Sequence, residues 1–132
     1  FVVMNADILT TISFSEMMEF HNATGSTVTI CARDFNLQVP FGVLNVEGTT
    51  LISMQEKPVH KHLVNAGIYV LSPIVLQFIK DNEPLDLPNL IERVMAAGHK
   101  VSVFHINEYW IDIGRIEDLD RARAEYATIF DI

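Results

Sequence analysis

The chain has 132 residues, 49% hydrophobic and 20% charged, which fits one domain or part of one and excludes a disordered chain. Its net charge of −8 argues against nucleic acid as a partner, because non-specific binding needs a basic surface. An anionic small substrate stays possible in a cleft with its own lysine and metal. No apolar run is long enough for a membrane-spanning helix. The single cysteine, Cys31, lies in an apolar run, which is typical of a small buried hydrophobic residue. With one cysteine and no membrane-spanning run, we expect a cytoplasmic protein with no membrane partner.

The first quarter of the chain predicts a strand, a helix and a second strand. An apolar run at 1–4 is followed by Asn5, Ala6 and Asp7. A capping box at 13–16 begins a helix that is expected to end near residue 23. The β-branched run 27–32 predicts a buried strand, and the order strand, helix, strand indicates a right-handed parallel crossover.

From residue 39 on, the pattern predicts a hairpin, one more strand, and then helices separated by a strand. The strands are expected at 39–46, 50–55, 64–71 and 100–106. The helices are expected at 73–80, 87–97 and 116–129. Gly48 marks the hairpin turn, Ser72 and Asp86 supply helix starts, and residues 59–62 are expected to form a polar loop. This alternation predicts an α/β fold with a mixed sheet flanked by helices.

Two aspartates follow separate apolar runs. Asp7 ends the first predicted strand, and Asp112 follows Trp110 and precedes Gly114. Ligands bind at the carboxyl ends of strands in open α/β sheets, where carboxylates can hold Mg²⁺ that also binds phosphate oxygens. The alternative for each aspartate is a structural role at a turn or helix entry. For Asp7 alone this alternative is favoured, whereas the motif around Asp112 is more specific, because four demanding residue types occur together.

A second charged group, Glu56-Lys57-Pro58, follows the hairpin. Lys57 offers a point charge for a phosphate, and Glu56 can accept two sugar hydroxyls. The alternative is a solvated charged turn. Gly42 and Gly67 stand inside strand patterns, which indicates either the close approach of a ligand or backbone, or a β-bulge.

Five motifs follow one another along nearly the whole chain. They are Asn5-Ala6-Asp7, Phe41-Gly42-Val43, Glu56-Lys57-Pro58, Asn65-Ala66-Gly67-Ile68-Tyr69 and Trp110-Ile111-Asp112-Ile113-Gly114. In this order they resemble the sugar-1-phosphate nucleotidyltransferases, the family of mannose-1-phosphate guanylyltransferase and glucose-1-phosphate thymidylyltransferase. The resemblance implies a partial Rossmann-like nucleotide-diphospho-sugar transferase fold, with residues 1–132 as the C-terminal portion of a single nucleotidyltransferase domain. It implies that the Gly-rich phosphate loop precedes residue 1, so this piece alone is expected to be inactive or nearly so.

The resemblance also implies a reaction. A sugar-1-phosphate oxygen attacks the α-phosphate of a nucleoside triphosphate, pyrophosphate leaves, and an NDP-sugar forms, most closely as in the guanylyltransferases. Asp7 and Asp112 would hold Mg²⁺ and Lys57 would contact the sugar's phosphate, which makes these three the catalytic candidates. The substrate-binding candidates are Gly42, Glu56, Lys57, Asn65, Gly67 and Trp110.

Three positions depart from the family pattern: Ala6 replaces a common glycine, Phe41 a frequent tyrosine, and Arg115 a usual threonine. Two alternatives to an enzyme are a non-catalytic sugar-phosphate-binding or regulatory module of the same fold, and a metal-independent α/β interaction domain. The presence of Asp7, Lys57 and Asp112 together favours the enzyme. We also expect an unpaired sheet edge with exposed apolar surface, which favours self-association.

Overall fold

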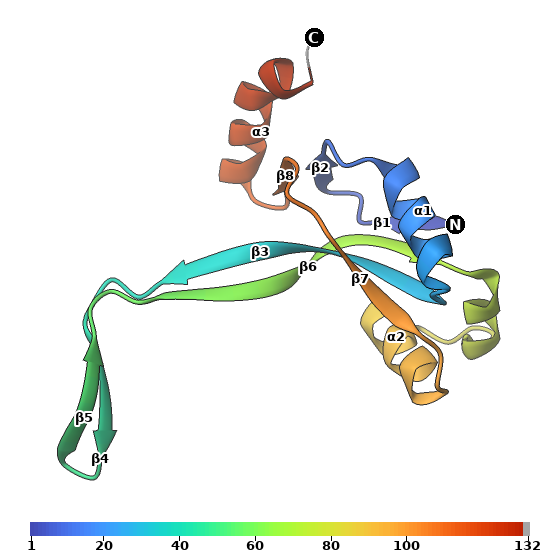
Figure 1. The fold of residues 1–132 in the computed structure, drawn as a ribbon. Helices are drawn as coiled ribbons and strands as arrows, with labels where there is room; N and C mark the ends of the chain where they lie inside the picture. Colours follow the sequence, from blue (N-terminus) through green and yellow to red (C-terminus); the bar gives the residue numbers. More distant parts are fainter. Residues whose placement is uncertain (131–132) are drawn as a thin grey trace. The chain divides into compact units, whose positions relative to one another are not determined.

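The computed structural model describes residues 1–130 of the chain and divides it into two compact units (Figure 1). The first unit comprises Phe1–Ala32 and the chain from Asn65 onward, and the second comprises Arg33–Val64. Among the helices of residues 1–130, none combines the length and the apolar character that crossing a membrane requires.

The first unit contains most of the regular structure. Its strands, in chain order, are β1 (Val2–Met4), β2 (Ile8–Thr10), part of β3 (Val28–Gln38), part of β6 (Val59–Leu71), β7 (Val101–His105) and β8 (Trp110–Asp112). Its helices are α1 (Phe14–Thr24), the 3₁₀ helix η1 (Pro73–Phe78), α2 (Leu87–Ala96) and α3 (Ile116–Ile129).

The main sheet has the strand order β1-β6-β3-β7. β1 runs antiparallel to β6, with Val2 opposite Val70, and β3 runs parallel to β7, with Val28 opposite Val101. The predicted mixed sheet is therefore confirmed. β6 lies between β1 and β3, so the strands before and after α1 are not neighbours in the sheet. That they form a right-handed parallel crossover stays a prediction.

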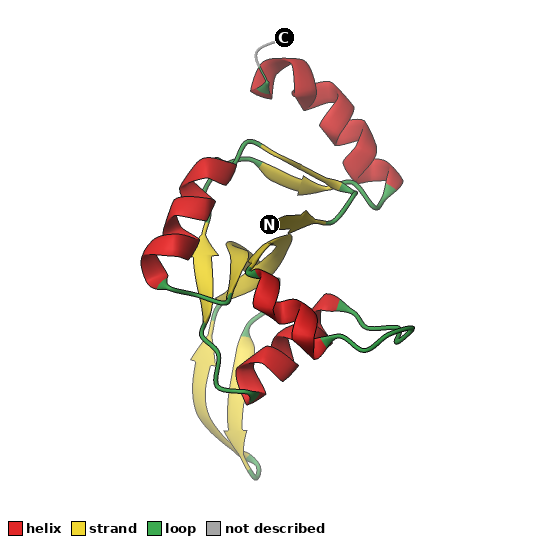
Figure 2. Cartoon of the chain, turned by 90° about the vertical axis from the view of Figure 1, so that its right-hand side faces the viewer, coloured by secondary structure: helices red, strands yellow, loops and turns green. Residues whose placement is uncertain are grey.

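Helices cover both faces of this sheet (Figure 2). Alternate residues of β6 enter two separate cores, since successive side chains of a strand point to opposite faces. Ile68 packs in one core with Met17 of α1, and Tyr69 packs in the other with Val94 of α2. The result is the layered α/β arrangement that the sequence predicts.

Side chains cap the starts of α1 and α2 as predicted. The Ser13 hydroxyl accepts a hydrogen bond from the Glu16 N–H at 3.2 Å, and the Asp86 carboxylate accepts one from the Asn89 N–H at 2.9 Å. Each bond satisfies a backbone donor of the first helical turn. Gly25 ends α1 in the left-handed region, with φ +62°.

The helix predicted at 73–80 is wrong in type and length. The segment is the 3₁₀ helix η1, which ends at Phe78, and Ser72 makes no capping hydrogen bond to it. The Ser72 hydroxyl instead lies 2.8 Å from Nε2 of the buried His21. Ser72, which has the position of a helix N-cap in the sequence, therefore makes a tertiary contact with His21 instead.

Two strand predictions also need correction. Residues 59–62, expected to be a loop, form the start of β6. Their polar side chains are exposed, so the polarity reflects contact with water and not the end of a strand. The short strands β2 and β8, which pair with each other, were not predicted.

The second unit is built on the predicted hairpin. β4 (Val43–Glu47) and β5 (Thr50–Gln55) pair antiparallel, and Glu47 lies opposite Thr50 across a two-residue turn. Gly48 occupies the first turn position with φ +60°, which favours glycine. β4 begins later than predicted, because the chain bends at residues 40–41 between β3, which ends at Gln38, and β4.

Cys31 lies in β3 and is fully buried. Burial raises the pKa of its thiol to about 11, so the thiolate does not form near neutral pH. The interpretation of Cys31 as a small buried hydrophobe is confirmed.

Candidate functional site

Backbone pairing between β2 and β8 brings Asp7 and Asp112 together. Ile8 lies opposite Asp112 in this antiparallel pair, so the residue before β2 meets the end of β8. The Ile113 N–H also donates a hydrogen bond to the Asp7 carbonyl at 2.8 Å. The two aspartates, 105 positions apart in the chain numbering, are thus fixed by the backbone of two short strands.

The carboxylates of Asp7 and Asp112 both lie close to Gly114. Its N–H donates a hydrogen bond to Asp112 Oδ1 at 2.8 Å, which orients that carboxylate. A Cβ at Gly114 would lie 3.0 Å from Asp112 Oδ1 and 3.4 Å from Asp7 Oδ2. Both oxygens therefore face one small space, and a side chain at residue 114 would crowd it.

This pair of carboxylates fits a hard divalent cation. Mg²⁺ is usually held by one or two carboxylates together with water and substrate phosphate oxygens. Within residues 1–130, no group of three or more His, Cys, Asp or Glu side chains is placed to hold a metal.

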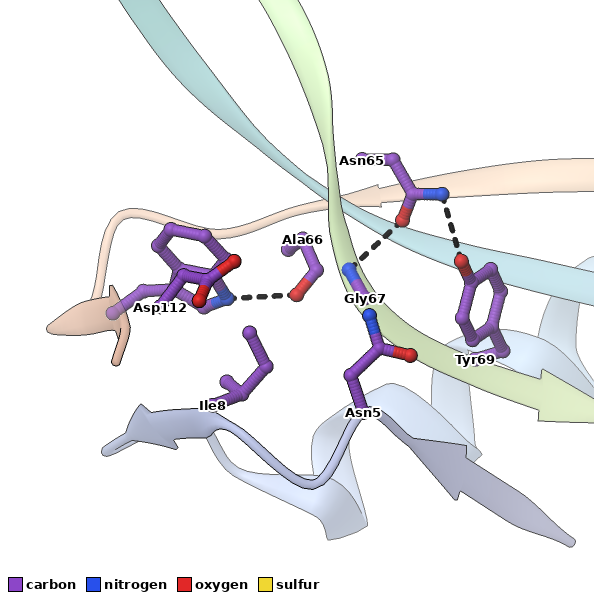
Figure 3. A pocket seen from close by; sticks show the side chains of 8 residues that line it. Asn5, Ile8, Asn65, Ala66, Gly67, Tyr69 and Asp112 are labelled. Atoms are coloured by element: carbon purple, nitrogen blue, oxygen red, sulfur yellow. Dashed lines mark hydrogen bonds between the residues drawn. The ribbon is translucent and has the colours of Figure 1, made fainter. Parts of the chain in front are cut away.

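A pocket of about 170 Å³ opens beside Asp112 (Figure 3). Four of the predicted site residues line it: Asn65, Gly67, Trp110 and Asp112. Pockets for whole drug-sized ligands measure roughly 300–1,000 Å³, so this one suits a single small ring or group.

Trp110 forms a wall of this pocket. Its indole N–H donates a hydrogen bond to the Ala66 carbonyl at 2.8 Å, and its ring packs against the buried core. The bond ties β8 to β6 beside the aspartates. Trp110 therefore lines the pocket beside Asp112, and its contact with a substrate stays a prediction.

Asn65 and Gly67 lie on β6, with Asn65 at the rim of the pocket. The Asn65 side-chain carbonyl accepts a hydrogen bond from the Gly67 N–H, and its amide donates one to the Tyr69 hydroxyl, both at 2.8 Å. Gly67 has φ +75°, a conformation that favours glycine.

Four pocket residues were not among the predicted site residues: Asn5, Ile8, Ala66 and Tyr69. The Asn5 N–H donates a hydrogen bond to the Gly67 carbonyl at 2.9 Å. This contact follows from the pairing of β1 with β6, which the sequence does not show. The sequence did point to Asn5 and Tyr69, because both belong to motifs that also contain predicted site residues.

Gly42, Glu56 and Lys57 lie together in the second unit. A Cβ at Gly42 would lie 3.4 Å from Glu56 Oε2, so this carboxylate covers the glycine backbone. Lys57 has φ +43°, which is unusual for a residue with a side chain. The structure brings these three residues together in one unit and the other five predicted site residues together in the other. That the two groups act on one substrate stays a prediction.

Arg115, one of the departures from the family pattern, is paired within α3. Its Nε donates to Asp118 Oδ2 at 2.7 Å, and its pKa is raised mainly by this hydrogen bond. The Arg115 side chain is nevertheless 78% exposed.

Comparison with known proteins gives a consistent result. The family model described as Nucleotidyl transferase matches residues 1–129. The chain is 33% identical over 122 residues to the mannose-1-phosphate guanyltransferase of Yarrowia lipolytica, covering 89% of this chain and 33% of that protein. It is 28% identical over 133 residues to the protein of the same name from Candida albicans, covering 97% of this chain and 36% of that protein.

A solved structure gives the same fold. The UTP-bound UGPase from Acinetobacter baumannii matches with a TM-score of 0.65 at 19% identity, covering 96% of this chain and 50% of that one. At this identity the likeness shows the fold alone. The chain spans about a third of the length of the curated relatives that it matches.

Proposed function

We propose that the protein transfers a nucleotidyl group from a nucleoside triphosphate to a sugar-1-phosphate, because this chain belongs to the sugar-1-phosphate nucleotidyltransferase family. The products are an NDP-sugar and pyrophosphate. The relatives named mannose-1-phosphate guanyltransferase support GTP and mannose-1-phosphate as the specific substrates. A cytoplasmic location fits a chain whose single cysteine is a buried free thiol.

The single observation that carries the proposal is the convergence of two carboxylates beside a pocket. Asp7 Oδ2 and Asp112 Oδ1 face the same space at Gly114, and Asp112 also lines the pocket. Phosphoryl and nucleotidyl transfer depend on positioning and charge neutralisation more than on a protein acid or base. Two converging carboxylates suit that chemistry.

Each of the residues around this site has a role in the proposed reaction. Asp7 and Asp112 would hold Mg²⁺, which supplies neutralisation of the phosphate charges when bound. The Gly114 N–H keeps the Asp112 carboxylate in place, and Trp110 walls the adjoining pocket. Lys57 would contact the sugar's phosphate as a point charge.

The second unit supplies the remaining proposed contacts. Glu56 would accept hydrogen bonds from sugar hydroxyls, and the Gly42 backbone lies directly beneath its carboxylate. Hydrogen bonds to a charged acceptor are about twice as strong as those between neutral groups. Glu56 would therefore contribute to the choice of sugar.

Pyrophosphate release tests this proposal. The full-length gene product that contains these residues is mixed with GTP, mannose-1-phosphate and Mg²⁺. We expect turnover that falls at least about 100-fold in Asp112→Asn, because a misplaced metal removes transition-state stabilisation. Asp120→Asn, an exposed aspartate of α3 in a loose 3.7 Å ion pair, is the control and should keep full activity. Absence of pyrophosphate with every combination of nucleoside triphosphate and hexose-1-phosphate would contradict the proposal.

A further inference from the structure

We propose that Arg115 binds a phosphate group of the ligand at Asp7 and Asp112. The inference rests on the proposed function, which supplies a ligand with phosphates at this point. Arg115 stands where the chain departs from the family pattern, so the resemblance assigns it no role. The place of Arg115 in the chain, the way its guanidinium is held and the charges around it support this one.

The backbone places Arg115 beside the carboxylate pair. Arg115 directly follows Gly114, where a Cβ would lie 3.0 Å from Asp112 Oδ1 and 3.4 Å from Asp7 Oδ2. The Arg115 carbonyl accepts a hydrogen bond from the Leu119 N–H at 3.0 Å, which fixes its backbone at the start of α3. Arg115 is also the lysine or arginine that stands closest to Asp112 along the chain. A cation is therefore anchored one residue from the point that both carboxylates approach.

Asp118 holds one edge of the Arg115 guanidinium. Arg115 Nε donates to Asp118 Oδ2 at 2.7 Å, and Nη2 donates to Asp118 Oδ1 at 3.4 Å. The other edge of the fork, formed by N–H groups of Nη1 and Nη2, makes no hydrogen bond with any residue that the structure describes. A guanidinium binds phosphate through two parallel N–H groups. Such a contact can form at the outer edge without breaking the pair with Asp118.

The two members of this ion pair differ in exposure. The Arg115 side chain is 78% exposed, whereas that of Asp118 is 18% exposed. A surface ion pair contributes little to stability, so the main effect of Asp118 is to orient the guanidinium. The better-buried carboxylate thus anchors a cation that stays accessible to a ligand.

The charges around the site call for a further cation when phosphates are bound. Mg²⁺ would balance the two aspartates, but a nucleoside triphosphate and a sugar-1-phosphate bring more negative charge than the ion and Lys57 neutralise. The pKa of Arg115 is raised first by the hydrogen bond to Asp118 and more weakly by the charge of Asp112 among others, so Arg115 and Asp112 act on each other. Arginine stays charged at all physiological pH values. Arg115 would therefore neutralise phosphate charge next to the metal.

Calorimetric titration of the full-length gene product with pyrophosphate and with GDP-mannose, each with Mg²⁺, tests the inference. We expect Arg115→Ala to weaken both affinities about tenfold, the effect of losing a charge-assisted contact. Arg115→Lys should recover part of the loss, because lysine keeps the charge but not the fork. The melting temperature should stay the same, since the ion pair lies at the surface.

Two controls separate phosphate binding from other effects. Affinity for Mg²⁺ alone should not fall in Arg115→Ala, because removing a cation does not weaken the attraction of carboxylates for a metal. Arg123→Ala removes an arginine of the same helix that is 72% exposed and forms a loose 3.7 Å ion pair with Asp120. This variant should bind both ligands as the wild type does.

Unchanged affinity of Arg115→Ala for both ligands would overturn the assignment while leaving the proposed function intact. A loss that comes with an equal loss of Mg²⁺ affinity, or with a lowered melting temperature, would overturn it as well, because the variant would then have disturbed the metal site or the fold. Failure of the wild type to bind pyrophosphate or any sugar nucleotide with Mg²⁺ would overturn the proposed function, and the inference with it.

Discussion

His21 is a buried titratable residue whose two ring nitrogens both contact hydroxyl groups. Its ring nitrogens lie 2.8 Å from the Thr29 hydroxyl and 2.8 Å from the Ser72 hydroxyl. Ser72 donates its own proton to the Ser26 carbonyl at 3.3 Å, so it accepts from the Nε2–H of His21. In a neutral ring, Nδ1 would then accept a hydrogen bond from the Thr29 hydroxyl. Burial lowers the pKa of His21 below its ordinary value of 6.5.

We expect this histidine to make folding stability depend on pH. The unfolded chain binds a proton near pH 6.5 while the folded chain resists it, so stability is full above pH 6.5 and falls as the pH drops below it. Urea unfolding at pH 7.5, 6.5 and 5.5 measures the effect. His21→Gln should flatten the pH dependence, and the exposed His60→Gln should not. A slope that persists in His21→Gln would contradict this.

Gly114 provides a residue-scale test of the carboxylate pair. We expect Gly114→Ala to reduce turnover about 100-fold, because the new Cβ would lie 3.0 Å from Asp112 Oδ1 and displace a carboxylate that must be accurately placed. The backbone at Gly114 does not have a positive φ, so the melting temperature should change little. Steady-state kinetics and thermal unfolding measure the two effects, and wild-type turnover in the variant would argue against convergence at this point.

At the scale of elements, the start of α2 depends on one side chain. Asp86 accepts the Asn89 N–H at 2.9 Å. We expect Asp86→Ala to lower the free energy of unfolding by about 1 kcal/mol, the usual cost of losing an N-cap. Urea denaturation measures it, with Asp81→Ala in the exposed loop as the control. An unchanged midpoint in Asp86→Ala would show that the cap is dispensable.

The elements also show how far the sequence predicts the fold. Helix starts at Ser13 and Asp86 were predictable because the capping side chain and its backbone donor are three residues apart. The start of β6 and the type of η1 were not, since both depend on residues distant in sequence. The motifs of Asp7 and Asp112 mark them as candidate metal ligands, a role that stays a prediction, whereas the place of Asn5 required the pairing of β1 with β6.

At the scale of the whole molecule, we expect the 132-residue chain to self-associate through the edge of its main sheet. β1 is an edge strand, and its residues Val2 and Met4 are 39% and 42% exposed. Unpaired edges with apolar side chains favour pairing with another chain. Sedimentation velocity should show concentration-dependent association that Val2→Lys reduces, and a monomer at all concentrations would contradict this expectation.

The central claim is that Asp7 and Asp112 jointly hold Mg²⁺ for a sugar nucleotide. The most direct measurement is the affinity of the full-length gene product for GDP-mannose with and without Mg²⁺, in the wild type, Asp7→Asn, Asp112→Asn and the double variant. We expect Mg²⁺ to tighten binding in the wild type, each single variant to lose most of that gain, and the double variant to lose little more. Single variants that keep the full Mg²⁺-dependent gain would contradict the claim.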